Sequence, residues 1–65
     1  MDLTAEQAAQ LLKVTRRSIY RYVESGKLKA RRHGFRAYVI NLDDLREFAT
    51  QNKLFFDDSL AQQLG

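Results

Sequence analysis

Residues 13–36 read KVTRRSIYRYVESGKLKARRHGFR, and this stretch decides how the chain is expected to fold. It contains nine Lys and Arg residues and one acid, Glu24, which together give a formal charge of +8. The other residues include two basic and seven acidic side chains, a formal charge of −5, so the whole chain carries only +3. A window this one-sided is typical of a surface that contacts a polyanion.

Within this stretch, residues 15–25 have the pattern of a short amphipathic helix. Thr15 belongs to the residue types preferred at a helix N-cap, and Gly26 suits the left-handed position just after a helix. Apolar residues at helical spacing predict the inward stripe: Ile19, Tyr22 and Val23. The helix is too short to persist without tertiary packing, so we expect it to lie on a core built by other segments.

A second helix is predicted directly before it. Thr4 is placed as its N-cap, and Gln7 three positions later can complete a capping box. Its apolar residues recur at i, i+3, i+4 and i+7: Ala5, Ala8, Ala9 and Leu12. Only Lys13 and Val14 separate the two helices, and such a short connection predicts a helix-turn-helix.

After Leu28, a predicted core residue, residues 29–32 and 35–40 are expected to form two strands around His33 and Gly34. Asn41 then caps a third helix, whose predicted inward stripe is Leu42, Leu45, Phe48 and Ala49. The order helix, helix, hairpin, helix predicts a mostly α fold with a small β-hairpin wing, a winged helix-turn-helix. Residues 1–52 would form this domain. Residues 53–65 would be a tail with a short helix, packed on the core or on a partner.

Composition limits the chemistry that the chain can perform. A chain of 65 residues has a small core, and without cysteine it forms no disulfide and has only His33 and carboxylates as metal ligands. The paired acids, Asp43 with Asp44 and Asp57 with Asp58, lie near predicted helix starts, where carboxylates are stabilising. We therefore expect no enzyme activity, no metal and no cofactor. No apolar run is long enough to span a membrane, and we expect a cytoplasmic, nucleoid-associated protein.

Residues 3 to about 49 carry a family resemblance in three segments: residues 3–21, residues 26–30 (GKLKA), and Ile40 with Leu45 and Phe48. The pattern resembles excisionase-type DNA-binding proteins, small relatives of the MerR-type winged-helix regulators. The resemblance implies that the helix beginning at Thr15 enters the major groove and that the hairpin, residues 29–40, contacts the backbone or the minor groove. One departure is that Ala37 and Val39 occupy the returning strand, where the family often has basic residues.

The residues expected at a DNA interface follow from their positions. Base readout is assigned to the outward face of the second helix: Arg17, Tyr20 and Arg21. Backbone contacts are assigned to the helix start and the following loop: Thr15, Arg16, Ser18, Lys27 and Lys29. The wing contributes Arg31, Arg32, His33, Gly34 and Arg36. Alternatives remain open: a solvated basic face, and for Tyr20 a half-buried surface aromatic.

These observations predict sequence-specific binding of double-stranded DNA by a small transcription regulator. One alternative is an excisionase, a recombination directionality factor that bends attachment-site DNA beside an integrase. The family resemblance also suggests cooperative self-association on repeated sites. A different class of function is a protein-interaction module that uses the tail, residues 54–64. The sequence is also compatible with the DNA-binding domain of a longer protein.

Overall fold

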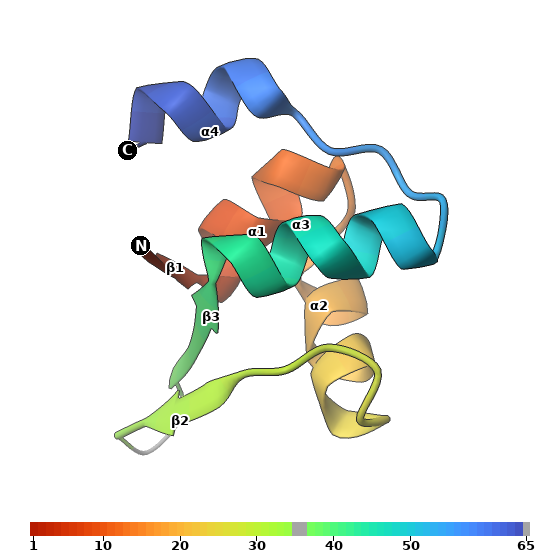
Figure 1. The fold of residues 1–65 in the computed structure, drawn as a ribbon. Helices are drawn as coiled ribbons and strands as arrows, with labels where there is room; N and C mark the ends of the chain where they lie inside the picture. The colour runs from red at the N-terminus through yellow and green to blue at the C-terminus, as the bar shows by residue number, and fades with distance from the viewer. Residues whose placement is uncertain (35–36, 65) are drawn as a thin grey trace.

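In the computed structural model, which describes residues 1–34 and 37–64, four helices pack beside a three-stranded antiparallel sheet that lies on one side of the molecule (Figure 1). The elements in chain order are β1 (Asp2–Thr4), α1 (Ala5–Leu12), α2 (Arg16–Glu24), β2 (Arg31–His33), β3 (Ala37–Asn41), α3 (Leu42–Gln51) and α4 (Asp58–Leu64). The predicted winged helix-turn-helix is confirmed, with α1 and α2 as the helix pair, β2 and β3 as the wing, and α3 as the helix that follows the wing.

The sheet differs from the predicted two-stranded hairpin. An additional strand, β1, pairs with β3, so the strand order is β1-β3-β2. Leu3 lies opposite Ile40, and both side chains are buried, which explains why the N-terminal residues join the sheet. The predicted strand at 29–32 is wrong in its bounds: β2 begins only at Arg31, because the chain leaves the sheet toward the buried Leu28.

The returning strand is also shifted from its predicted range. β3 extends from Ala37 to Asn41, one residue beyond the predicted end, and the first two residues of the predicted strand, 35 and 36, lie outside the described residues. Asn41 both ends this strand and caps α3, because its Oδ1 accepts hydrogen bonds from the N–H groups of Asp43 (2.8 Å) and Asp44 (3.3 Å). The wing therefore passes directly into the third helix.

The helix starts follow the sequence prediction. Thr4 and Gln7 form the complete capping box, with the Gln7 N–H donating to Thr4 Oγ1 (3.1 Å) and the Thr4 N–H donating to Gln7 Oε1 (3.0 Å). Thr15 caps α2, because its Oγ1 accepts the Ser18 N–H at 3.2 Å. These caps fix where each helix begins, and only residues 13–15 lie between α1 and α2.

Three helices end in the same way, with one residue in the left-handed conformation. The residue is Lys13 (φ 58°) after α1, Gly26 (φ 80°) after α2 and Lys53 (φ 56°) after α3. In each case the next N–H donates to a carbonyl five residues back: Val14 to Ala9 (3.0 Å), Lys27 to Tyr22 (3.0 Å) and Leu54 to Ala49 (2.8 Å). This is the Schellman arrangement, predicted here only for Gly26.

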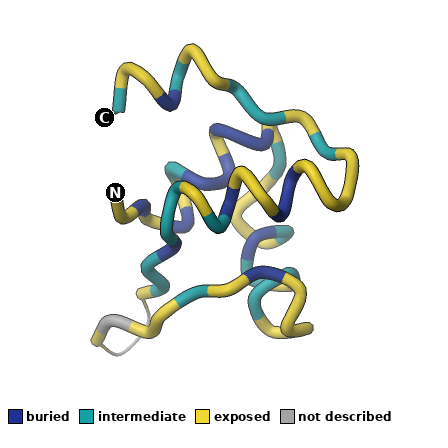
Figure 2. Tube along the Cα trace, in the orientation of Figure 1, coloured by how far each residue is buried: buried dark blue, intermediate teal, exposed yellow. Residues whose placement is uncertain are grey.

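The core lies between α1, α3, the sheet and one side of α2 (Figure 2). Its fully buried large side chains are Leu3, Leu11, Ile19, Ile40 and Leu45. The tail runs back over α1: the Asp57 N–H donates to the Leu11 carbonyl (2.9 Å), and Ala61 of α4 is buried. Asp57 rather than Asp58 caps α4, since its Oδ1 accepts the Leu60 N–H at 3.0 Å.

Candidate nucleic-acid interface

The second helix leaves most of its surface free. Ile19 is its only buried residue, whereas Arg16, Arg17 and Arg21 are all exposed. Arg17 and Arg21 are four residues apart and therefore lie one turn apart on the same face, opposite Ile19. The first turn of α2 contains no acid that would offset these charges. The helix thus presents two guanidinium groups on one exposed face.

Two aromatic contacts hold α2 against the rest of the molecule. The ring of Tyr22 packs against Phe48 of α3 with centroids 4.9 Å apart. The ring of Tyr20 packs against Tyr38 of β3 with centroids 5.6 Å apart and an interplanar angle of 50°. Tyr20 is half-buried, so it joins the helix to the wing. Its predicted part in base readout stays a prediction.

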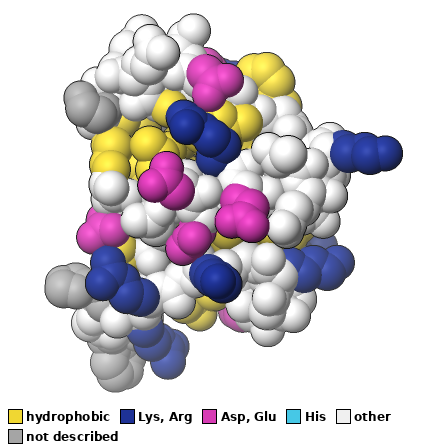
Figure 3. All heavy atoms as spheres, in the orientation of Figure 1, with side chains coloured by type: hydrophobic (Ala, Val, Ile, Leu, Met, Phe, Trp, Pro, Cys, Tyr) yellow, Lys and Arg dark blue, Asp and Glu magenta, His cyan; other side chains and the backbone are white. Residues whose placement is uncertain are grey.

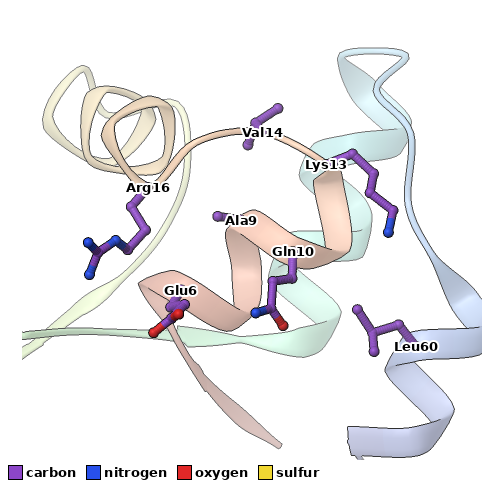
Figure 4. Close-up of a pocket in the computed structure, with 7 residues that line it drawn as sticks. All are labelled: Glu6, Ala9, Gln10, Lys13, Val14, Arg16 and Leu60. Atoms are coloured by element: carbon purple, nitrogen blue, oxygen red, sulfur yellow. The ribbon is translucent and has the colours of Figure 1, made fainter.

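The start of α2 combines a cap with a cationic side chain. Thr15 Oγ1 and Ser18 Oγ lie 3.2 Å apart, so the two hydroxyls predicted to contact the DNA backbone hydrogen-bond to each other. Arg16 takes part in lining an open groove of about 520 Å³ between α1, the turn and α4. In Figure 4, the Arg16 side chain extends on the same side of α1 as Glu6, whereas Lys13 and Leu60 lie on the other side.

The loop after α2 alternates exposed and buried residues. Lys27 and Lys29 are exposed, while Leu28 between them is only 2% exposed and anchors the loop in the core. Both lysines line a small hollow against Asp44 and other residues of α3. The two predicted backbone-contacting lysines therefore flank a buried residue in the loop between α2 and the wing.

The two wing arginines that the structure describes lie on opposite faces of the sheet, because successive strand residues alternate. Arg32 pairs with Tyr38, whose ring contacts Tyr20, so Arg32 shares the face turned toward α2. Arg31 pairs with Val39 on the outer face. Both arginines are exposed. These two arginines therefore do not form one cluster.

Arg31 has a partner that the sequence did not predict. Its Nη2 lies 2.9 Å from Oδ2 of Asp2, and the two side chains are 74% and 53% exposed. Asp2 belongs to β1, so this ion pair crosses the sheet from one edge strand to the other. Nothing in the local sequence signals it, because it requires knowing that β1 pairs with β3.

The turn of the wing is described in part. Gly34 has φ 73°, which is the left-handed conformation that glycine adopts without strain. Arg36 lies outside the described residues, and of His33 the structure describes the backbone, at the end of β2. The predicted contacts of these residues with DNA stay predictions.

Acidic and basic side chains are distributed unevenly over the visible face. In Figure 3, acidic side chains gather over α3 at the centre of the view, with a basic side chain above them, while other Lys and Arg side chains lie along the lower edge, over β2 and the segment between α2 and β2. The acids of α3 are Asp43, Asp44 and Glu47. The basic edge therefore joins the exposed face of α2 to the wing, and the acidic face lies on the third helix.

This arrangement of α2, the wing and α3 defines a class of protein, the winged helix-turn-helix proteins. A family model described as a helix-turn-helix domain matches residues 3–53. The chain belongs to this family, and the resemblance predicted from the sequence is confirmed. Membership in the family supports DNA binding. Among the described residues, no helix has the length and apolar character needed to cross a membrane.

Relatives are found in mycobacteria. The chain is 39% identical over 62 residues to the uncharacterized proteins Mb2337 of Mycobacterium bovis and Rv2310 of Mycobacterium tuberculosis. Each alignment covers 95% of this chain and 54% of the relative, so the chain spans about half the length of the curated relatives it matches. No solved structure matches the chain significantly.

Proposed function

We propose that this chain binds double-stranded DNA sequence-specifically and acts as a small transcription regulator. The observation that supports this function best is the free face of α2, where Arg17 and Arg21 are exposed one turn apart while Ile19 alone is buried. Each guanidinium has the fork geometry that matches the O6 and N7 acceptors of guanine in the major groove. The function is binding, and no reaction is assigned to the chain.

The remaining contacts would fix the position of the helix on DNA. The start of α2, with Thr15, Arg16 and Ser18, would meet phosphate, helped by the partial positive charge of the helix N-terminus. The loop lysines, Lys27 and Lys29, would follow the backbone toward the wing. Arg32 lies on the side of the sheet that faces α2, so it would contact the DNA strand closest to the recognition helix.

The test is fluorescence anisotropy with labelled genomic and mixed-sequence duplexes across a salt series. We expect Arg17→Ala and Arg21→Ala each to reduce discrimination between the preferred and the mixed-sequence duplex by about 1–3 kcal/mol. With roughly six phosphate contacts, log K should fall against log salt with a slope of about −5. Wild-type binding no tighter than millimolar at low salt would contradict the proposal.

A matched control separates readout from loss of charge. Lys53 is exposed and lies after α3, and Lys53→Asn removes one positive charge there, with a residue that tolerates the left-handed conformation. We expect this variant to weaken binding slightly and equally for all duplexes. Mapping the bound sites then tests the regulatory role: sites in promoters agree with it, whereas sites beside an integrase gene would indicate an excisionase.

A further inference from the structure

The outer face of the sheet carries a feature that the proposed contacts do not use. Asp2 of β1 and Arg31 of β2 form an ion pair of 2.9 Å that passes over β3 between them. An open hollow of about 460 Å³ lies at this place, lined by Asp2, Arg31, Arg32 and Val39. A predicted DNA-contacting arginine is thus already bound to a carboxylate of the same chain.

The position of Asp2 is set by the backbone rather than by the ion pair. Asp2 lies opposite Asn41 and Leu3 opposite Ile40 in the antiparallel ladder. The Leu42 N–H also donates to the Met1 carbonyl at 2.9 Å, which holds the chain end against the start of α3. Because Leu3 is buried, a shift of β1 by one residue would expose it. The backbone of Asp2 is therefore held at a place from which its carboxylate reaches Arg31.

The pair is exposed, and such pairs are weak. A phosphate oxygen is an acceptor of the same kind as a carboxylate oxygen and can take the same guanidinium donors. We propose that Asp2 competes with DNA for Arg31: in the free protein it occupies the Arg31 guanidinium on the outer face of the sheet, and a backbone phosphate replaces it on binding. This inference rests on the proposed function, since it assumes that the wing meets DNA.

The proposal predicts that removing the Asp2 charge tightens DNA binding and that this gain depends on Arg31. Asp2→Asn keeps the size of the side chain but releases Arg31, so binding should tighten by roughly two- to fivefold, the factor that a weak exposed pair is worth. Asp2→Glu keeps the charge and a reach to Arg31, and should bind DNA about as the wild type does.

The experiment is a double-variant cycle, measured by anisotropy on one mixed-sequence duplex. It compares Asp2→Asn, Arg31→Gln and the double variant with the wild type. The matched control is Asp43→Asn, which removes one exposed acidic charge from the nearby start of α3. We expect the gain from Asp2→Asn to disappear when Arg31 is absent, whereas the smaller effect of Asp43→Asn should be the same with or without Arg31.

Two results would overturn the inference: an Asp2→Asn gain that persists without Arg31, or an effect equal to that of Asp43→Asn. The failure of the proposed function gives a different pattern, in which the wild type binds no duplex or binds independently of Arg17 and Arg21.

The ion pair itself is checked without DNA. The NMR signal of the Arg31 guanidinium should shift in Asp2→Asn and stay in place in Asp43→Asn, and an unchanged signal in Asp2→Asn would overturn the inference on its own.

Discussion

The helices α1 and α2 are neighbours of almost equal length, yet they use their surfaces in opposite ways. α1 has eight residues and buries five: Ala5, Ala8, Ala9, Leu11 and Leu12. α2 has nine residues and buries one, Ile19. Both begin with a threonine cap and both end in a left-handed residue. The difference shows that α1 supplies the support, and that α2 is attached at a few points so that its remaining face is free to bind.

The largest expected effect comes from removing the point at which α2 is anchored. Ile19 is completely buried, so Ile19→Ala removes apolar contacts and leaves a cavity in the core. We expect a loss of about 3 kcal/mol in the free energy of unfolding. Because a domain of this size has a total stability on the order of 3–10 kcal/mol, the variant should be close to unfolding at room temperature. Urea denaturation followed by circular dichroism at low temperature measures the change.

Two further substitutions test whether this loss reflects the anchoring of α2. Ile19→Val removes a single methyl group and should cost about 1 kcal/mol. Leu11→Ala in α1 should cost about as much stability as Ile19→Ala, because both side chains are fully buried. In that variant, however, α1 stays attached to the core through its four other buried residues. If Ile19→Ala lost less than Ile19→Val is expected to lose, α2 would be held mainly by other contacts.

Much of this architecture could be predicted from the sequence, because the signals involved are local. Thr4 with Gln7, Thr15, and Asn41 with Asp44 mark the helix starts, and their caps are formed as expected. Apolar spacing gave the inward faces of α1, α2 and α3, but the predicted stripe of α1 left out Leu11, which is fully buried. Gly26 marked the end of α2, because glycine is the residue that adopts φ 80° without a steric cost.

What could not be predicted depends on long-range pairing or on residues that carry no signal. β1 has only three residues, and its pairing with β3 is visible only once Leu3 and Ile40 are seen to share the core. Lys13 and Lys53 adopt left-handed conformations, which cannot be predicted from a lysine in the sequence because lysine has no preference for them. The ion pair between Asp2 and Arg31 and the contact between Tyr20 and Tyr38 also depend on long-range pairing, and neither was predicted.

A smaller effect is expected at the helix ends, where α2 stops at glycine and α3 stops at lysine. Gly26→Ala should cost about 1–2 kcal/mol, since an added Cβ meets no atom within 4 Å and the strain comes from φ 80° alone. Lys53→Gly should be close to neutral, because the relief of strain at φ 56° is offset by the flexibility of glycine in the unfolded chain. Thermal unfolding of both variants measures the contrast, and an equal loss in the two would show that the left-handed strain is unimportant here.

The smallest expected effect concerns the contact between α2 and the wing. Tyr20 and Tyr38 pack with centroids 5.6 Å apart, and aromatic pairs of this kind contribute about 0.5–1.5 kcal/mol beyond their buried area. A double-variant cycle of Tyr20→Ala and Tyr38→Ala, measured by urea denaturation, should therefore give a coupling energy of that size. A coupling energy of zero would mean that the helix and the wing are positioned independently of each other.

The same two single variants also separate the two possible uses of Tyr20 on DNA. If Tyr20 only holds the wing beside α2, Tyr20→Ala and Tyr38→Ala disrupt the same contact and should weaken DNA binding by the same factor. If Tyr20 also touches a base, its removal should cost more than that of Tyr38, and the excess should depend on the DNA sequence. The base readout predicted for Tyr20 from the sequence requires the second outcome, whereas its half-buried position in the free protein favours equal losses. Anisotropy with the preferred and the mixed-sequence duplex distinguishes the two outcomes.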